Sequence, residues 1–106
     1  MPRPFRRFEL LLPTSFNNGS PVSDEIMGQT LREIRKKFGA VSVETQAVEG
    51  HWEHQGTVYR DLNVSIFVDV PDTEANRQFF IEFKERLKER FQQIDIWMTT
   101  YPLEVI

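Results

Sequence analysis

The amino-acid sequence predicts an α+β fold in which four strands form one antiparallel sheet and two helices cover one of its faces. Three observations predict this fold. The run 59–72 alternates apolar and polar residues with the period of a half-buried strand. The segments 24–38 and 80–91 carry apolar residues at helical spacing instead. A chain of 106 residues, 40% of them hydrophobic, can bury one core, so a single domain over residues 1–106 is expected.

The first strand and the first helix are bounded by clear local signals. The strand 8–12 is mostly apolar on both faces, with Glu9 as its one charged residue, and it ends at Pro13. A cluster of turn formers at 17–21 leads to Ser23, which can cap a helix, and Gly39 can end that helix after Phe38. The predicted helix 24–38 buries one apolar stripe, formed by Met27, Leu31, Ile34 and Phe38.

The second and third strands are predicted as one long hairpin, 41–54 and 57–72, joined by a turn at Gln55 and Gly56. This turn places His54 opposite Thr57 and Trp52 opposite Tyr59. The same register, continued without interruption, pairs Val43 with Val68, Thr45 with Ile66 and Ala47 with Val64. Five aliphatic residues are expected on the buried side of the third strand: Leu62, Val64, Ile66, Val68 and Val70. Because each strand is longer than the helices, the hairpin tip is expected to project.

The second helix follows Pro71, with Asp72 or Thr73 as its cap and a stripe of Phe80, Phe83, Leu87 and Phe91. A last strand is predicted over 94–100, with Trp97 pointing away from the core and Pro102 ending the regular structure. The order is strand, helix, strand, strand, helix, strand. With right-handed crossovers, this order predicts a ferredoxin-like βαββαβ sandwich with an extended central hairpin.

Composition narrows the function classes. Without cysteine there is no disulfide framework, thiolate metal site or cysteine nucleophile. A net charge of −3 gives no broad attraction to nucleic acid or anionic membranes, so neither is an expected partner. The apolar run 10–12 is too short for a signal or membrane segment. A cytoplasmic protein is therefore expected.

The helix-free face of the sheet is the main candidate surface. Alternation of the strands places large apolar residues there, namely Leu11, Val48, Phe67 and Trp97, beside polar Glu44, Gln46, Ser65 and Asp69. Soluble monomers seldom expose an aromatic patch of this kind, so a partner or a ligand is expected to cover it. The alternative is that the C-terminal tail 103–106 or the loop 14–21 folds over it.

The sequence does not predict a catalytic or metal site. His51 and His54 are three residues apart on a strand and point to opposite faces, so they cannot share one ion without a bulge. His54 and Asp61 share a face, but they lie too far apart across the ladder for a proton-transfer pair. No nucleophile constellation or phosphate-binding loop is present in the sequence, so no cofactor is expected.

Four short elements mark the chain: G-x-W at 50–52, Y-R-D at 59–61, P-D-T at 71–73 and R-F-Q-Q at 90–93. Together they span much of its length. In these elements the chain resembles a family of small bacterial proteins whose function is unknown. The resemblance implies a bacterial protein and brings no activity to carry over.

The leading hypothesis is a non-catalytic module that forms a homodimer or joins a larger protein assembly. Its interface would be the open sheet face, with Phe67 and Trp97, together with the projecting pair Trp52 and Tyr59. An alternative is a small dimeric enzyme or ligand-binding protein whose pocket is lined by Phe67 and Trp97. The residues at the mouth of that pocket would be His54, Tyr59, Arg60 and Asp61.

A third hypothesis is binding of single-stranded RNA, because sheets of this topology can stack bases on exposed aromatic rings. It needs basic residues around Phe67, and the sequence places Glu44 and Asp69 there. It is the least favoured of the three.

Overall fold

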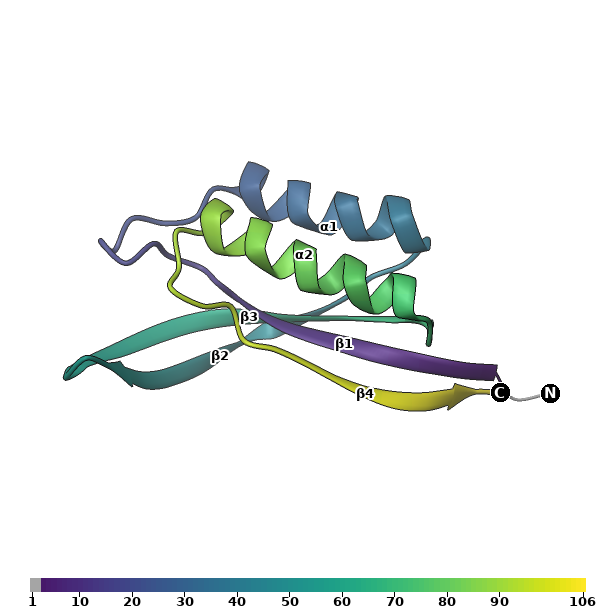
Figure 1. The fold of residues 1–106 in the computed structure, drawn as a ribbon. Coiled ribbons are helices and arrows are strands. Elements are labelled where there is room, and N and C mark those ends of the chain that lie inside the picture. Colours follow the sequence, from purple (N-terminus) through teal and green to yellow (C-terminus); the bar gives the residue numbers. More distant parts are fainter. Residues whose placement is uncertain (1–2) are drawn as a thin grey trace.

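The computed structural model describes residues 3–106 and shows one sheet with both helices on the same face (Figure 1). In chain order the elements are β1 (Arg3–Pro13), α1 (Asp24–Phe38), β2 (Ser42–His54), β3 (Thr57–Pro71), α2 (Glu74–Arg90) and β4 (Met98–Val105). The strands lie in the order β2-β3-β1-β4, and each neighbouring pair is antiparallel. The predicted ferredoxin-like βαββαβ sandwich is confirmed; residues 1–2 of the predicted domain lie outside the described residues.

Helix α1 has the bounds that its capping residues predict. The Ser23 hydroxyl accepts a hydrogen bond of 3.2 Å from the backbone N–H of Ile26. Gly39 follows the helix with φ 86°, a left-handed conformation that glycine adopts at little cost, and its N–H donates to the carbonyl of Arg35. Local chemistry therefore determines both ends of this helix.

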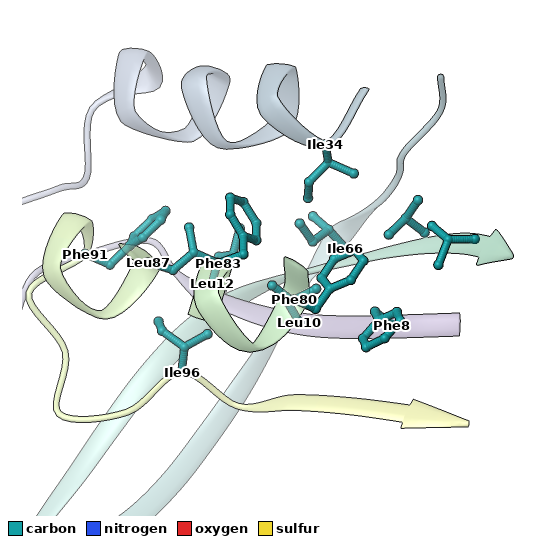
Figure 2. Packing of buried hydrophobic residues seen from close by; sticks show 12 residues of the cluster. Phe8, Leu10, Leu12, Ile34, Ile66, Phe80, Phe83, Leu87, Phe91 and Ile96 are labelled. Atoms are coloured by element: carbon teal, nitrogen blue, oxygen red, sulfur yellow. The ribbon is translucent and has the colours of Figure 1, made fainter. Parts of the chain in front are cut away.

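The core lies between the helices and the sheet (Figure 2). The predicted stripe of α2 is buried, with Phe80, Phe83, Leu87 and Phe91 each 0% exposed. Phe80 stacks on Phe8 of β1 with ring centroids 4.0 Å apart and on Phe38 of α1 at 5.4 Å. One ring thus joins the sheet to both helices.

The last strand begins later and runs further than predicted. Residues 94–97 form an irregular connection in which Ile94 is 46% exposed and Ile96 is buried. β4 then continues through Pro102, although proline was expected to end it. Proline is tolerated there because β4 is an edge strand, where a missing N–H donor does not break the ladder if it faces outward.

The C-terminal segment does not fold over the open face. Leu103 and Val105 pair with Phe5 and Arg3 as part of β4. Trp97 is 65% exposed, so neither this segment nor the loop after β1 covers its ring. The alternative in which the chain shields its own open face is therefore wrong at this residue.

The hairpin has the predicted turn but not one continuous register. At the tip, His54 pairs with Thr57 and Trp52 with Tyr59, as predicted. Further along, three residues of β2, 45–47, stand against Val64 alone, which makes a bulge. Val43 consequently pairs with Ile66, and the predicted pairing of Val43 with Val68 is wrong, as are those of Thr45 with Ile66 and Ala47 with Val64.

The projecting part of the hairpin, residues 48–63, is called the arm. Figure 1 shows its tip extending past the ends of both helices. Leu62 was expected to be buried with the other aliphatic residues of β3, yet its side chain is 53% exposed. Val64 packs against the core while Leu62 does not, because the helical layer ends between them.

Candidate binding surfaces on the arm and the open face

Trp52 is the residue that connects its neighbours on the helix-free side of the arm. Its indole N–H donates a hydrogen bond of 2.6 Å to the carboxylate of Asp61. Its ring also stacks on Tyr59, with centroids 4.3 Å apart and planes 15° from parallel. The pairing of Trp52 with Tyr59 explains the contact, because directly opposite side chains on one face are close neighbours. The structure thus joins three of the predicted site residues in one unit.

His54 and Asp61 do not form a proton-transfer pair. Asp61 is bonded to the Trp52 indole, and no hydrogen bond links it to His54 within residues 3–106. The ring of His54 instead lies 6.5 Å from that of Trp52. His51 is on the opposite side of β2, and no set of at least three residues suited to metal binding exists in the described part of the chain.

Arg60, the last of the five predicted arm residues, points to the other side of the arm, where it meets Glu49 and His51. Arg60 Nη2 lies 2.8 Å from Glu49 Oε1, and His51 Nε2 lies 2.9 Å from Glu49 Oε2. The hydrogen bond from His51 and the charge and hydrogen bond of Arg60 lower the pKa of Glu49 from 4.5 to about 2. The carboxylate in turn raises the pKa of Arg60.

The low pKa of Glu49 is a testable property of the folded arm. Replacing His51 by alanine removes the largest contribution, so the pKa should rise toward 4.5 in an NMR titration of the carboxyl carbon. Because folding lowers this pKa, the cluster stabilises the arm above about pH 4.5 and loses that effect as the pH falls toward 2. His54→Ala, on the other side of the strand, should leave the titration unchanged. A native Glu49 that titrates near 4.5 would contradict the geometry.

Phe67 and Trp97, predicted as one patch, are separated by β1. Phe67 of β3 pairs with Glu9 of β1. Trp97 lies beside the other edge of β1, where its carbonyl accepts a hydrogen bond from the backbone N–H of Leu11. The guanidinium of Arg7 lies over the Phe67 ring, 4.3 Å from its centroid. The open face is therefore less uniformly apolar than its alternation pattern predicts.

Arg7 is held over Phe67 by Asp69 with two hydrogen bonds, of 2.7 and 3.0 Å. This contact raises the pKa of Arg7 above its ordinary value. Because the cation is paired with a carboxylate and covers the ring, a nucleobase could stack on Phe67 only by displacing it. The arrangement adds nothing to the RNA-binding hypothesis.

A cavity of about 440 Å³ opens where the arm meets the connection between α2 and β4. Its lining comes from β1, from both strands of the arm and from the connection: Leu11, Pro13, Gly50, His51, Trp52, Asp61, Asn63, Gln93, Asp95, Ile96 and Trp97. Three predicted site residues, Trp52, Asp61 and Trp97, therefore share one concave site. His54, Tyr59, Arg60 and Phe67 are not in its lining.

Sequence reasoning missed several residues of these surfaces. Asn63 was not identified as a candidate residue, yet it is only 8% exposed and its amide reaches the carbonyl of Val48. Gly50 explains the burial, because an added Cβ there would come within 3.2 Å of the Asn63 amide. The sequence contains little signal for this contact: Asn63 is one polar residue in an alternating strand, and Gly50 lies two residues beyond Val48, the partner of Asn63.

Comparisons with known proteins show the fold and no family. No family model and no curated protein sequence matches the chain. A phage SAM lyase in complex with S-methyl-5'-thioadenosine has a TM-score of 0.69 at 11% identity, covering 95% of this chain and 88% of that one. CutA1 from Oryza sativa has a TM-score of 0.65 at 11% identity, over 99% and 84% of the two chains. The divalent cation tolerance protein CutA1 of Thermus thermophilus has a TM-score of 0.62 at 15% identity, over 93% and 84%. At such identities the likeness establishes the small ferredoxin-like fold alone.

Proposed function

We propose that this protein is a non-catalytic, self-associating module whose arm packs against a second copy of the chain. The observation that carries the proposal lies on the helix-bearing side of the arm, beyond the helical layer. There Val58 is 64% exposed and Leu62 is 53% exposed. A strand normally buries its apolar side, and here the chain itself supplies no cover. A second copy would bury these residues.

The charges around Val58 and Leu62 suit contact between identical surfaces. Glu49 and Glu53 lie on the same side of the arm as His51 and Arg60, so both signs occur beside the apolar residues. In a twofold contact the same surface of both copies meets, and residue i of one copy contacts residue j of the other while j contacts i. An acidic residue of one copy can therefore meet a basic residue of the other, so a surface with both signs can be complementary to itself. We therefore propose a homodimer, the simplest closed assembly, with Trp97 and Tyr101 of the open face as a further exposed apolar surface.

The test is the mass of the protein in solution, measured by light scattering. The native chain should have twice the 12.5 kDa of one chain at micromolar concentration. Leu62→Asp should reduce the mass to that of one chain, because a carboxylate would be buried in the interface without a partner. The matched control is Ile81→Asp on α2, where the native side chain is 60% exposed and away from the arm.

Two results would contradict the proposal. One is a native monomer that acquires no partner at micromolar concentration. The other is an oligomer that both aspartate variants leave intact, or that Ile81→Asp disrupts as strongly as Leu62→Asp. Circular dichroism of each variant shows beforehand that the fold is retained.

The cavity supports a second candidate function, binding of a small molecule. Its volume of about 440 Å³ falls within the range of ligand sites, and it combines apolar walls with a few polar groups. The structurally similar phage SAM lyase was solved in complex with S-methyl-5'-thioadenosine. The first test is binding of that compound by calorimetry, with Trp97→Ala expected to weaken it and Phe67→Ala, outside the cavity, expected to have no effect.

The remaining expectations stay predictions. None of the helices in residues 3–106 is long and apolar enough to cross a lipid bilayer. We propose a cytoplasmic location from the cysteine-free composition, which a reducing compartment permits. Membership of the family of small bacterial proteins is likewise a proposal that rests on the four short sequence elements.

A further inference from the structure

The polar groups of the cavity are mostly hydrogen-bond acceptors. The Asp61 carboxylate takes one hydrogen bond from Trp52 and retains further acceptor positions. The amide nitrogen of Asn63 is directed to the carbonyls of Val48 and Asp61, at 3.4 and 3.5 Å. Its side-chain oxygen accepts no hydrogen bond within the described residues 3–106 and is free for another donor. A ligand that donates hydrogen bonds fits this set.

The charge of the cavity is negative. Two carboxylates line it, those of Asp61 and Asp95, while no lysine or arginine does so within residues 3–106. Asp95 is compensated by Lys84, 3.1 Å away, and the ring of His51 is engaged by Glu49. Asp61 is bonded only to a neutral indole, so its charge is not balanced within the site. An anionic ligand would be repelled here, and a neutral or cationic one would not.

Aromatic rings supply the apolar walls. Trp52 and Trp97 come from separate segments and both line the cavity. Trp52 is fixed by its stacking on Tyr59 and by its bond to Asp61, so it meets a ligand as a pre-positioned surface. Trp97 is 65% exposed and has room to be covered by a bound molecule. A planar ring of a ligand can stack on the indole of a tryptophan, and a positive charge on the ligand adds cation–π attraction.

We propose that the cavity binds a planar, nucleoside-sized molecule that donates hydrogen bonds and is neutral or positively charged, and that it discriminates against anions. The proposal rests on the second candidate function, small-molecule binding, and is independent of self-association. Trp52 and Trp97 provide the surface for the ring, Asp61 provides the charge selection, and Asn63 accepts from the ligand.

Three probes that share the adenine base and the ribose ring, and differ in the group at the 5' position, test the charge selection by calorimetry. These are 5'-amino-5'-deoxyadenosine, adenosine and adenosine 5'-monophosphate, which are cationic, neutral and anionic at pH 7. The cationic and neutral probes should bind, and the monophosphate should bind at least about tenfold more weakly than adenosine, because it brings negative charge to Asp61. No binding of adenosine or its amino analogue at millimolar concentration, or equal binding of all three, would overturn the proposal.

Asp61→Asn separates charge from structure, because an amide oxygen can still accept from the Trp52 indole. In the native protein the cationic probe should bind more tightly than adenosine, because it is attracted by the Asp61 carboxylate. In the Asp61→Asn variant this preference should be lost, while adenosine binding changes little. Trp97→Ala should weaken both, and Phe67→Ala, outside the cavity, should weaken neither. A preference for the cation that survives Asp61→Asn would refute the role of Asp61.

Leu62→Asp distinguishes this inference from the proposed self-association, because Leu62 does not line the cavity. The site is contained in one chain, so this variant should bind adenosine like the native protein whether or not its mass changes. Loss of binding together with loss of the oligomer would show that one chain does not form the site.

Discussion

Replacement of Phe80 by alanine is expected to lower the free energy of unfolding by about 3–5 kcal/mol, the range for a truncated core phenylalanine. The side chain is 0% exposed and its ring stacks on Phe8 and Phe38. Truncation leaves a cavity at the point where the sheet meets both helices (Figure 2). Urea unfolding followed by circular dichroism measures the loss.

The neighbouring residue provides a matched control for this effect. Ile81 is also apolar and lies on the same helix, but its side chain is 60% exposed. Ile81→Ala should change the free energy of unfolding by less than about 0.5 kcal/mol, as exposed substitutions do. If the two variants proved equally stable, Phe80 would not be the junction of the core.

Replacement of Trp52 by leucine is expected to loosen the arm without unfolding the rest of the protein. The change removes the stacking on Tyr59 and the hydrogen bond to Asp61. These are worth about 0.5–1.5 kcal/mol for the aromatic pair and about 1.5–3 kcal/mol for a bond to a charged group. Backbone amides of the arm should therefore exchange hydrogen about 30- to 2000-fold faster.

Two comparisons make the Trp52 prediction specific. Trp52→Phe keeps a ring that can stack on Tyr59 but loses the indole donor, so its arm should exchange at an intermediate rate. Amides of β1 paired with β3 beyond the arm report on the core and should keep their native protection. If core and arm amides accelerate together, the arm is not a separate unit of local stability.

Local features of the sequence were predictable because their causes lie within a few residues. The bounds of α1 follow from Ser23 and Gly39, and the burial of the α2 stripe follows from its spacing. The turn at Gln55 and Gly56 determined the pairs at the hairpin tip, including Trp52 with Tyr59. The fold class followed from the order of these elements.

The bulge in β2 could not be read from alternation. It places three residues, 45–47, against Val64 and so shifts the pairing by an even number of residues. The paired residues on both sides of the bulge keep the parity that the continuous register gives them, so alternation is the same with or without the shift. Only the hydrogen-bonded ladder distinguishes the two registers.

The candidate cavity was predictable only in part. Trp52, Asp61 and Trp97 were identified as site residues from aromatic content and strand parity, and all three line it. Asn63 and Asp95 were not identified, because neither belongs to a motif. His54, Tyr59, Arg60 and Phe67, predicted with the others, lie elsewhere on the arm or the open face.

The sequence by itself determined the type and order of the elements and the face of most paired strand residues, since these depend on local periodicity, capping and turn chemistry; the bounds of β4 and the bulge in β2 were not determined in this way. Tertiary structure decided how far the helical layer extends. Leu62 and Val64 have the same parity and similar hydrophobicity, yet the structure exposes one and packs the other. It also decided that Asp61, Asn63 and Trp97 share a cavity. The burial of a side chain and its distance from other side chains depend on segments that are distant in the sequence. The residue pattern of one segment therefore does not predict where another segment ends.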